Sequence, residues 1–200
     1  MDANTVAGFL NGEFVAFDVE TTGFSPYNDR MTEISALLIR GGEAVSGCGY
    51  HTLINPQKPI PYNVGELTGI TDETVADAPL EGAALRGFYE FAGVRTLVAH
   101  NAKFDMGFIK SASRRCGFKC DFVCLDTLEM ARFLYPHFEN HKLGTLAGKL
   151  RLGNFTHHRA EADAAVLSSL FLVIIGELEK KIKIDSLAAL TAKLPNAVVK

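Results

Sequence analysis

The stretch EFVAFDVE, residues 13–20, places two carboxylates on an otherwise apolar segment. Its Val and Phe residues favour a β-strand, which the following TTG at residues 21–23 would end. Because side chains alternate across a strand, Asp18 and Glu20 project from the same face near its C-terminal end. Two acids there are costly to bury unless they are paired. The pair therefore indicates either an exposed strand end or one side of a cation site, and it does not by itself decide between them.

The segments that follow predict a mixed sheet flanked by helices. A turn at residues 25–29 leads to strands at 31–40 and 43–54, which with the first strand form an antiparallel meander. Helical spacing appears near 64–68 and 80–91. Further on, we expect strands at 95–99 and 121–124 and helices at 102–115, 127–134, 142–150 and 160–181. The predicted fold class is α/β, with a five-stranded sheet.

Length and composition fit one compact domain followed by a short tail. Two hundred residues with 48% hydrophobic content are enough for one core. We expect the domain at residues 1–181 and the tail, with one short helix and a frayed end, at 182–200. In the tail, Leu187, Leu190 and Leu194 are spaced i, i+3 and i+7. The tail would act as a linker, dock on a partner or cover the chain's own core.

Charge and cysteine content exclude several classes of protein. A net charge of −3 and a pI near 6.1 argue against broad electrostatic binding of duplex nucleic acid. No secretory signal or membrane-spanning run appears, so a cytoplasmic protein without membrane contact is expected. Cys116, Cys120 and Cys124 recur at every fourth position, unlike the paired Cys-x-x-Cys of structural zinc sites. Reduced thiols are the expected state.

Two more acids and a histidine lie near expected helix starts. Asp105 falls in the first turn of a helix for which Asn101 is a plausible N-cap, where the macrodipole favours an ionised carboxylate. That helix follows an apolar strand, so Asp105 would lie at the C-terminal edge of the sheet. His158 and Asp163 flank the start of the last long helix, and they reach a shared site only if His158 precedes it. Each residue alone also fits a helix-end charge or a solvated histidine.

Three motifs occur in order along the chain: FDVETTGFSP at 17–26, HNAKFDMGF at 100–108 and HRAEADA at 158–164. Together with ELTGIT at 66–71 and LDT at 125–127, this set resembles the DEDDh branch of the DnaQ-like family of 3′→5′ exonucleases. The resemblance covers about residues 14–170. It implies a ribonuclease H-like fold, in which two parallel strands complete the sheet, and an exonuclease domain at 1–181.

The resemblance also implies a set of catalytic residues. It makes four acids the metal-binding carboxylates and one histidine the general base: Asp18, Glu20, Asp105, Asp163 and His158. His157, one residue earlier, is expected at the surface. Oxygen ligation by four carboxylates implies two divalent cations, for which Mg²⁺ is expected and Mn²⁺ would substitute.

The expected substrate contacts gather around the first two motifs. Thr21 would help hold the terminal nucleotide, and Gly23 would let a phosphate approach the backbone closely. Phe24 and Leu67 would pack against the base or sugar, or else belong to the core. Asn101 completes this expected set.

The implied reaction is stepwise removal of nucleoside 5′-monophosphates from the 3′ end of single-stranded or frayed DNA, in proofreading or repair. A DNA polymerase, as a separate subunit or as the rest of a longer chain, is the expected partner. An RNA-trimming exonuclease is the alternative, because the motifs do not locate a readout of the 2′-hydroxyl. A non-catalytic, polymerase-associated binding module is a third interpretation, and the intact acids and histidine argue against it.

Overall fold

The computed structural model describes residues 12–152 and 160–200 of the chain. Its sheet has the strand order β3-β2-β1-β4-β5-β6. The strands are β1 (Glu13–Thr21), β2 (Met31–Arg40), β3 (Glu43–Leu53), β4 (Thr96–Ala99), β5 (Cys124–Asp126) and β6 (Val198–Val199). The predicted antiparallel meander and the two parallel strands are confirmed. The two-residue β6 adds a sixth, antiparallel strand where the sequence predicts a frayed end.

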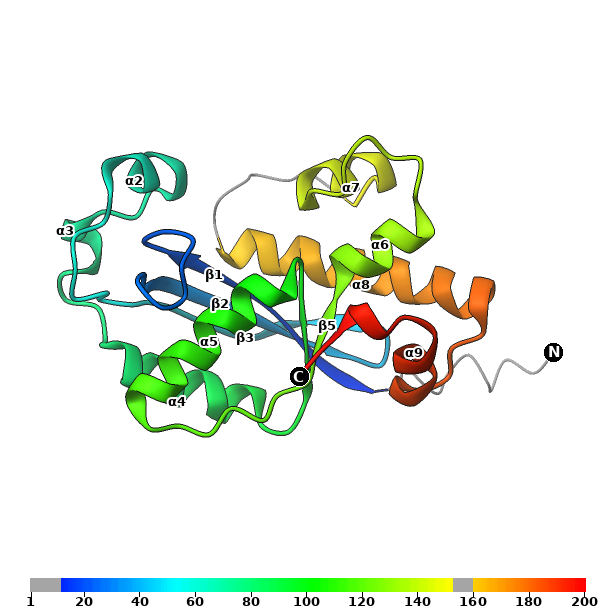
Figure 1. Cartoon of the computed structure of the whole chain (residues 1–200), viewed down its shortest axis with the longest axis horizontal. Helices are drawn as coiled ribbons and strands as arrows, with labels where there is room; N and C mark the ends of the chain where they lie inside the picture. The colour runs from blue at the N-terminus through cyan, green and yellow to red at the C-terminus, as the bar shows by residue number, and fades with distance from the viewer. Residues whose placement is uncertain (1–11, 153–159) are drawn as a thin grey trace.

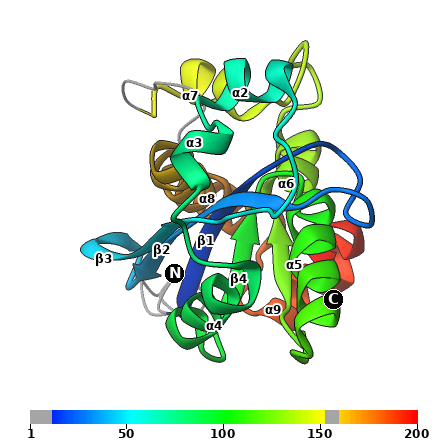
Figure 2. The ribbon, with the colours of Figure 1, turned by 90° about the vertical axis from the view of Figure 1, so that its left-hand side faces the viewer.

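The helices follow the predicted order closely. They are α2 (Tyr62–Thr68), α3 (Asp72–Val75), α4 (Glu81–Ala92), α5 (Ala102–Cys116), α6 (Thr127–Leu134), α7 (Leu143–Leu150), α8 (Ala160–Ile182) and α9 (Leu187–Lys193). Helix α3 was not predicted, since its four residues are too few to show an apolar period. A capping box between Thr71 and Thr74 stabilises its first turn. In both views α2 and α7 lie along the upper side of the molecule (Figures 1 and 2).

The side-chain alternation of β1 divides the core in two. Val15, Phe17 and Val19 pack with residues of α4 and α5 on one face of the sheet. Phe14 and Ala16 pack with residues of α8 on the other face, which that long helix crosses (Figure 1). Residues 18 and 20 share the parity of residues 14 and 16. The two carboxylates of β1 are therefore directed to the face that α8 covers.

The C-terminal segment packs against the domain that precedes it. Leu190 and Ala197 are buried in the core on the α8 face, with Leu187 and Leu194 partly buried around them. The apolar stripe of α9 thus covers the chain's own core. None of the described helices is long and apolar enough to cross a membrane. The four cysteines are free, and none belongs to a group of metal-ligating side chains among the described residues.

Candidate active site

Three of the predicted carboxylates converge at the end of β1. Asp18, Glu20 and Asp163 each offer an oxygen, and these oxygens lie within 4.8 Å of one another. Asp18 and Glu20 come from β1, and Asp163 comes from the first turn of α8, which begins beside the end of that strand (Figure 1). Asp163 is 9% exposed. The cluster therefore lies where the end of β1 meets the start of α8, largely shielded from water but still accessible from the surface.

Asp105 approaches the same strand end from the opposite face of the sheet. It lies in the first turn of α5, as predicted, and is 3% exposed. Its carboxylate accepts hydrogen bonds from the backbone amides of Val19 and of Asp105 itself. Asp105 is outside the three-carboxylate group, but its charge is the largest of the neighbouring charges that act on Asp18. Four acids thus share one electrostatic environment.

Ionisation of this cluster is costly in the absence of cations. Burial first, and then the charges of Asp105, Glu20 and Asp163, raise the pKa of Asp18 well above its usual value. Burial and the neighbouring acids Glu33 and Asp163 raise the pKa of Glu20 to about 7. Burial chiefly raises the pKa of Asp105 to about 8. Groups that must be ionised here need a compensating positive charge.

For Asp18, Glu20 and Asp105, that compensation does not come from a salt bridge with a described lysine or arginine. Converging, largely shielded carboxylate oxygens are the donor set that hard divalent cations prefer. The residues present therefore fit a metal centre. His158, the predicted base, and its neighbour His157 lie outside the described residues.

The loop between β1 and β2 is organised around the Asp29 carboxylate. This carboxylate accepts hydrogen bonds from the Ser25 amide at 3.0 Å, the Thr22 hydroxyl at 3.3 Å and the Lys58 ammonium at 3.1 Å. The same contacts from Ser25, Lys58 and Thr22 lower the pKa of Asp29 below its usual value. A Cβ on Gly23 would lie 2.5 Å from an Asp29 oxygen, so any other residue there would push the Asp29 carboxylate out of its hydrogen bonds.

This loop and helix α2 present the predicted substrate contacts. The Thr21 hydroxyl donates to the Gly23 carbonyl at 2.6 Å, within the turn that follows β1. The Phe24 side chain is 89% exposed and Leu67 is 55% exposed, so neither belongs to the core. Phe24 stands edge-on to Phe104 of α5, with ring centroids 6.4 Å apart. Both side chains are available to a ligand.

The capping interaction predicted for Asn101 is absent. Asn101 occupies the N-cap position of α5, but its φ of 70° and ψ of 49° are left-handed and its side chain makes no capping hydrogen bond. N-cap residues normally have extended backbone, so the left-handed turn takes the side chain out of capping geometry. The backbone N–H of Asn101 instead donates to the Asp126 carboxylate at 3.0 Å. The same carboxylate accepts from the backbone N–H of Leu128 and so caps α6. The Asn101 side chain is exposed.

Sequence reasoning missed a further acid beside the cluster. Glu33 lies opposite Glu20 in the β1–β2 ladder and is 7% exposed. The His51 Nε2 atom on β3 is 2.6 Å from its carboxylate. The signal was present in the sequence, since Glu33 interrupts the apolar strand MTEISALLIR just as Asp18 interrupts β1. Its charge contributes to the raised pKa of Glu20.

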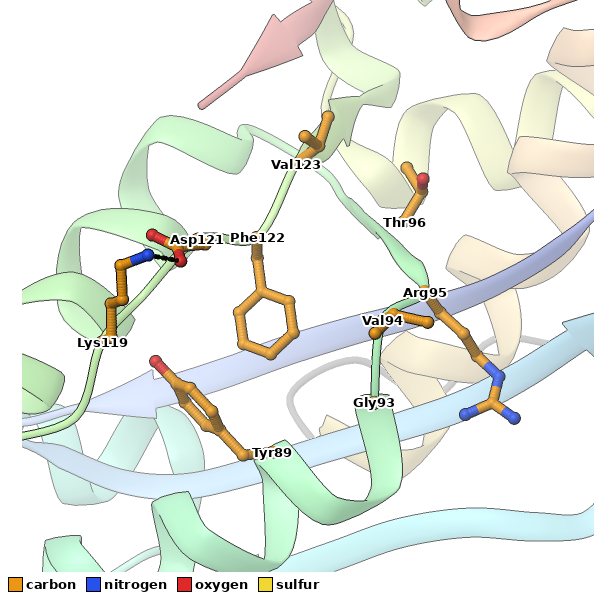
Figure 3. A pocket seen from close by; sticks show the side chains of 9 residues that line it. All are labelled: Tyr89, Gly93, Val94, Arg95, Thr96, Lys119, Asp121, Phe122 and Val123. Carbon is orange, nitrogen blue, oxygen red and sulfur yellow. Dashed lines mark ion pairs between the residues drawn. The ribbon is translucent and has the colours of Figure 1, made fainter.

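A separate hollow lies at the opposite edge of the sheet. It measures about 320 Å³ and is lined by the residues that precede β4 and β5. Figure 3 shows Tyr89 and Phe122 on its wall and Lys119 paired with Asp121 at its rim. Because β1, β4 and β5 are parallel, the carboxylate cluster lies at the other ends of these strands. This hollow is not part of the acidic site.

A mixed sheet with converging acids at the C-terminal edge of its parallel strands is an arrangement suited to metal-assisted cleavage of a phosphodiester. A family model described as exonuclease matches residues 15–171. The chain belongs to this exonuclease family, and the expected class of enzyme, a 3′→5′ exonuclease, is confirmed.

Curated relatives are much longer than this chain. PolC-type DNA polymerase III of Caldanaerobacter subterraneus subsp. tengcongensis is 43% identical over 171 residues, which cover 86% of this chain and 12% of the relative. The corresponding enzyme of Bacillus subtilis (strain 168) is 41% identical over 170 residues, covering 84% of this chain and 12% of the relative. The chain therefore spans 12% of the length of these relatives.

Solved structures show the same fold. Exonuclease X in complex with 5′ overhanging duplex DNA superposes with a TM-score of 0.67 at 25% identity, covering 82% of this chain and 92% of that one. E. coli exonuclease I in complex with a dA16 oligonucleotide gives a TM-score of 0.69 at 18% identity, covering 84% of this chain and 41% of that one. The predicted ribonuclease H-like α/β fold is confirmed.

Proposed function

We propose that this chain removes nucleotides one at a time from the 3′ end of single-stranded or frayed DNA and releases nucleoside 5′-monophosphates. The observation that carries the proposal is the convergence of the Asp18, Glu20 and Asp163 oxygens, with Asp105 beside them. The exonuclease family and the DNA-bound structural neighbours support it. The negative net charge agrees with a grip on a few terminal nucleotides rather than on a long duplex.

Two divalent cations, Mg²⁺ with Mn²⁺ as a substitute, would be held by four acids: Asp18, Glu20, Asp105 and Asp163. Four carboxylates offset the formal charge of two such ions, which removes the cost of ionising the buried cluster. When bound, the ions supply Lewis acidity toward the scissile phosphate and lower the pKa of an attacking water.

The protein groups have distinct roles in this proposal. His158 accepts the proton of the attacking water, a role suited to imidazole because its ordinary pKa is about 6.5. The HRAEADA motif supports this assignment, since it puts His158 two residues before α8 and five before Asp163. Thr21, Gly23 and the exposed Phe24 hold the terminal nucleotide. Leu67 packs against the base or sugar of that nucleotide, and Asn101 contacts the same strand.

A DNA polymerase is the proposed partner. The matching PolC-type relatives are polymerases in which this region is 12% of the chain. An exonuclease joined to a polymerase receives a frayed 3′ end at high effective concentration. Proofreading is accordingly the role that we propose.

The Asp29→Ala variant tests whether the β1–β2 loop positions the substrate. Removing the carboxylate takes an acceptor from the Ser25 amide, the Thr22 hydroxyl and the Lys58 ammonium, of which Lys58 keeps the Asn28 carbonyl. We expect roughly a tenfold rise in KM for single-stranded DNA with a smaller change in kcat, and a loss of about 1–3 kcal/mol in the free energy of unfolding. Steady-state kinetics and thermal unfolding measure both, with the exposed Asp77→Ala as control. A KM equal to that of the control would refute the positioning role.

End-labelled substrates test the proposed function itself. Single-stranded DNA and RNA of the same sequence, labelled at the 5′ or the 3′ end, are incubated with Mg²⁺, Mn²⁺ or EDTA. We expect a ladder that shortens from the 3′ end of DNA with either metal, and no cleavage in EDTA. Faster loss of RNA would favour the RNA-trimming alternative. Cleavage of neither polymer would leave a binding module as the better interpretation.

A further inference from the structure

A second pocket, of about 490 Å³, opens between the start of α5, helix α6 and the start of α7. The turn between β4 and α5 contributes His100 and Asn101 to its wall. Its other lining residues are Leu128, Arg132, Asn140, His141, Lys142 and Leu143. No carboxylate lines it among the described residues. In a chain with a net charge of −3, this is a local concentration of cationic and amide groups.

The two charged groups are accessible to a ligand. Lys142 is exposed and makes no salt bridge within the described residues. One Arg132 nitrogen, Nη1, forms a salt bridge with the Glu129 carboxylate at 2.6 Å, and the Arg132 side chain is 56% exposed. Exposed ion pairs of this kind contribute little to the stability of the fold, so the salt bridge does not prevent Arg132 from binding a ligand. The remaining guanidinium donors are free to bind a phosphate, for which arginine geometry is well suited.

The wall behind these groups is fixed by hydrogen bonds. The His100 Nε2 atom is 2.8 Å from the His141 carbonyl and its Nδ1 atom is 2.9 Å from the Thr127 hydroxyl. Burial lowers the pKa of His100 to about 4, so the ring is neutral and serves to hold the pocket wall in place through these two hydrogen bonds. The Lys142 amide donates to the Asn140 side chain at 3.1 Å, at the N-terminal end of α7. Lys142 is thus attached to a preorganised segment, which limits the entropy lost on binding.

The pocket adjoins the carboxylate cluster. Asn101 lines the pocket and is followed, one helical turn later in α5, by Asp105. The backbone N–H of Asn101 donates to the carboxylate of Asp126, the last residue of β5. This hydrogen bond holds the pocket wall at the C-terminal edge of the sheet. A strand whose terminal phosphate lies at the acids would extend along this edge. The pocket carries positive charge, whereas the neighbouring cluster carries negative charge, so the pocket can bind a phosphate that the acids alone would repel.

We propose that Arg132 and Lys142 bind a backbone phosphate of the substrate strand, upstream of the nucleotide that is removed. This inference rests on the proposed exonuclease function and adds a subsite to it. The bound group is a phosphodiester of single-stranded nucleic acid. Asn101 donates to the same phosphate from its exposed side chain. Occupancy of this subsite makes the affinity for a strand depend on its length and on salt.

The experiment compares a strand with a substrate too short to reach the pocket. Arg132→Gln, Lys142→Gln and the double variant act on a short oligothymidylate and on the p-nitrophenyl ester of thymidine 5′-monophosphate. We expect the double variant to raise KM for the oligonucleotide at least about tenfold, with kcat and ester cleavage unchanged. The slope of log KM against log salt should fall by about 0.7 for each phosphate that the variant no longer neutralises.

Lys119→Gln is the matched control, since Lys119 is 85% exposed at the opposite edge of the sheet. Lys142→Arg should restore most of the oligonucleotide affinity, which a merely structural role would not predict. An unchanged KM and salt slope in the double variant, with ester cleavage intact, would overturn the subsite and leave the exonuclease function standing. A change confined to inhibition by thymidine 5′-monophosphate would also overturn it, by showing that the pocket takes a free nucleotide. No cleavage of either substrate by the wild-type chain would instead refute the proposed function.

Discussion

Replacing Asp18 by Asn is expected to lower the rate of DNA hydrolysis by about a thousandfold or more while making the metal-free protein more stable. The oxygen of Asp18 belongs to the group that would hold both cations, so its charge is needed for catalysis. The same charge is disfavoured in the metal-free fold, because burial and four neighbouring acids raise the pKa of Asp18. A neutral amide of the same shape removes that repulsion. Loss of activity and gain of stability should therefore occur together.

Single-turnover kinetics with Mg²⁺ and thermal unfolding in EDTA measure the two effects. Asp121→Asn is the matched control, because Asp121 is exposed and paired with Lys119 at the opposite edge of the sheet. The control should keep the wild-type rate. An Asp18→Asn protein that retains its rate would remove Asp18 from the catalytic set. One that is less stable than wild type in EDTA would show that this carboxylate is not destabilised by burial.

Residue patterns predicted the fold and the position of the acids because both depend on short-range rules. The alternation of EFVAFDVE put Asp18 and Glu20 on one face, and the structure places that face against α8. The first-turn position of Asp105 followed from the apolar strand and the helix signal that precede it. The joining of β1, α5 and α8 at one site came from the ordered motifs, since no local pattern connects segments so distant in sequence.

Other features depend on tertiary contacts that no linear pattern encodes. Asn101 has the residue type of an N-cap, but its backbone N–H donates to Asp126 and its backbone is left-handed. In that conformation its side chain makes no capping hydrogen bond. Asp29 reads as an ordinary turn residue, although it binds Lys58 across 29 positions of sequence. The cationic pocket gathers residues from the turn after β4, from α6 and from the segment at the start of α7, and its basic residues look like solvated surface charges in the sequence.

In the absence of divalent cations, the free energy of unfolding should fall as the pH rises from about 4 to about 8. The folded-state pKa values of Glu20 and Asp105 are raised to about 7 and about 8, from ordinary values of 4.5 and 3.8. In this window the unfolded chain has already released protons that the folded chain still holds, so each increment of pH favours unfolding. Each unit of pKa displacement corresponds to about 1.4 kcal/mol, so the two groups together should lower the free energy of unfolding by on the order of 9 kcal/mol across this window. Below pH 4 both states are protonated and this contribution is constant.

Bound Mg²⁺ or Mn²⁺ should remove most of this pH dependence, because the cations stabilise the ionised carboxylates. The increase in melting temperature on adding either ion should be small at pH 5 and largest near pH 8, where the metal-free fold is most strained. Calorimetry in EDTA and in excess metal, at several pH values, measures both curves. Asp105→Asn should flatten the metal-free curve and reduce the metal-induced shift, whereas Asp121→Asn should leave both unchanged. A metal-free melting temperature that rises from pH 5 to 8, or a metal-induced shift that does not vary with pH, would mean that the four acids do not form one cation site.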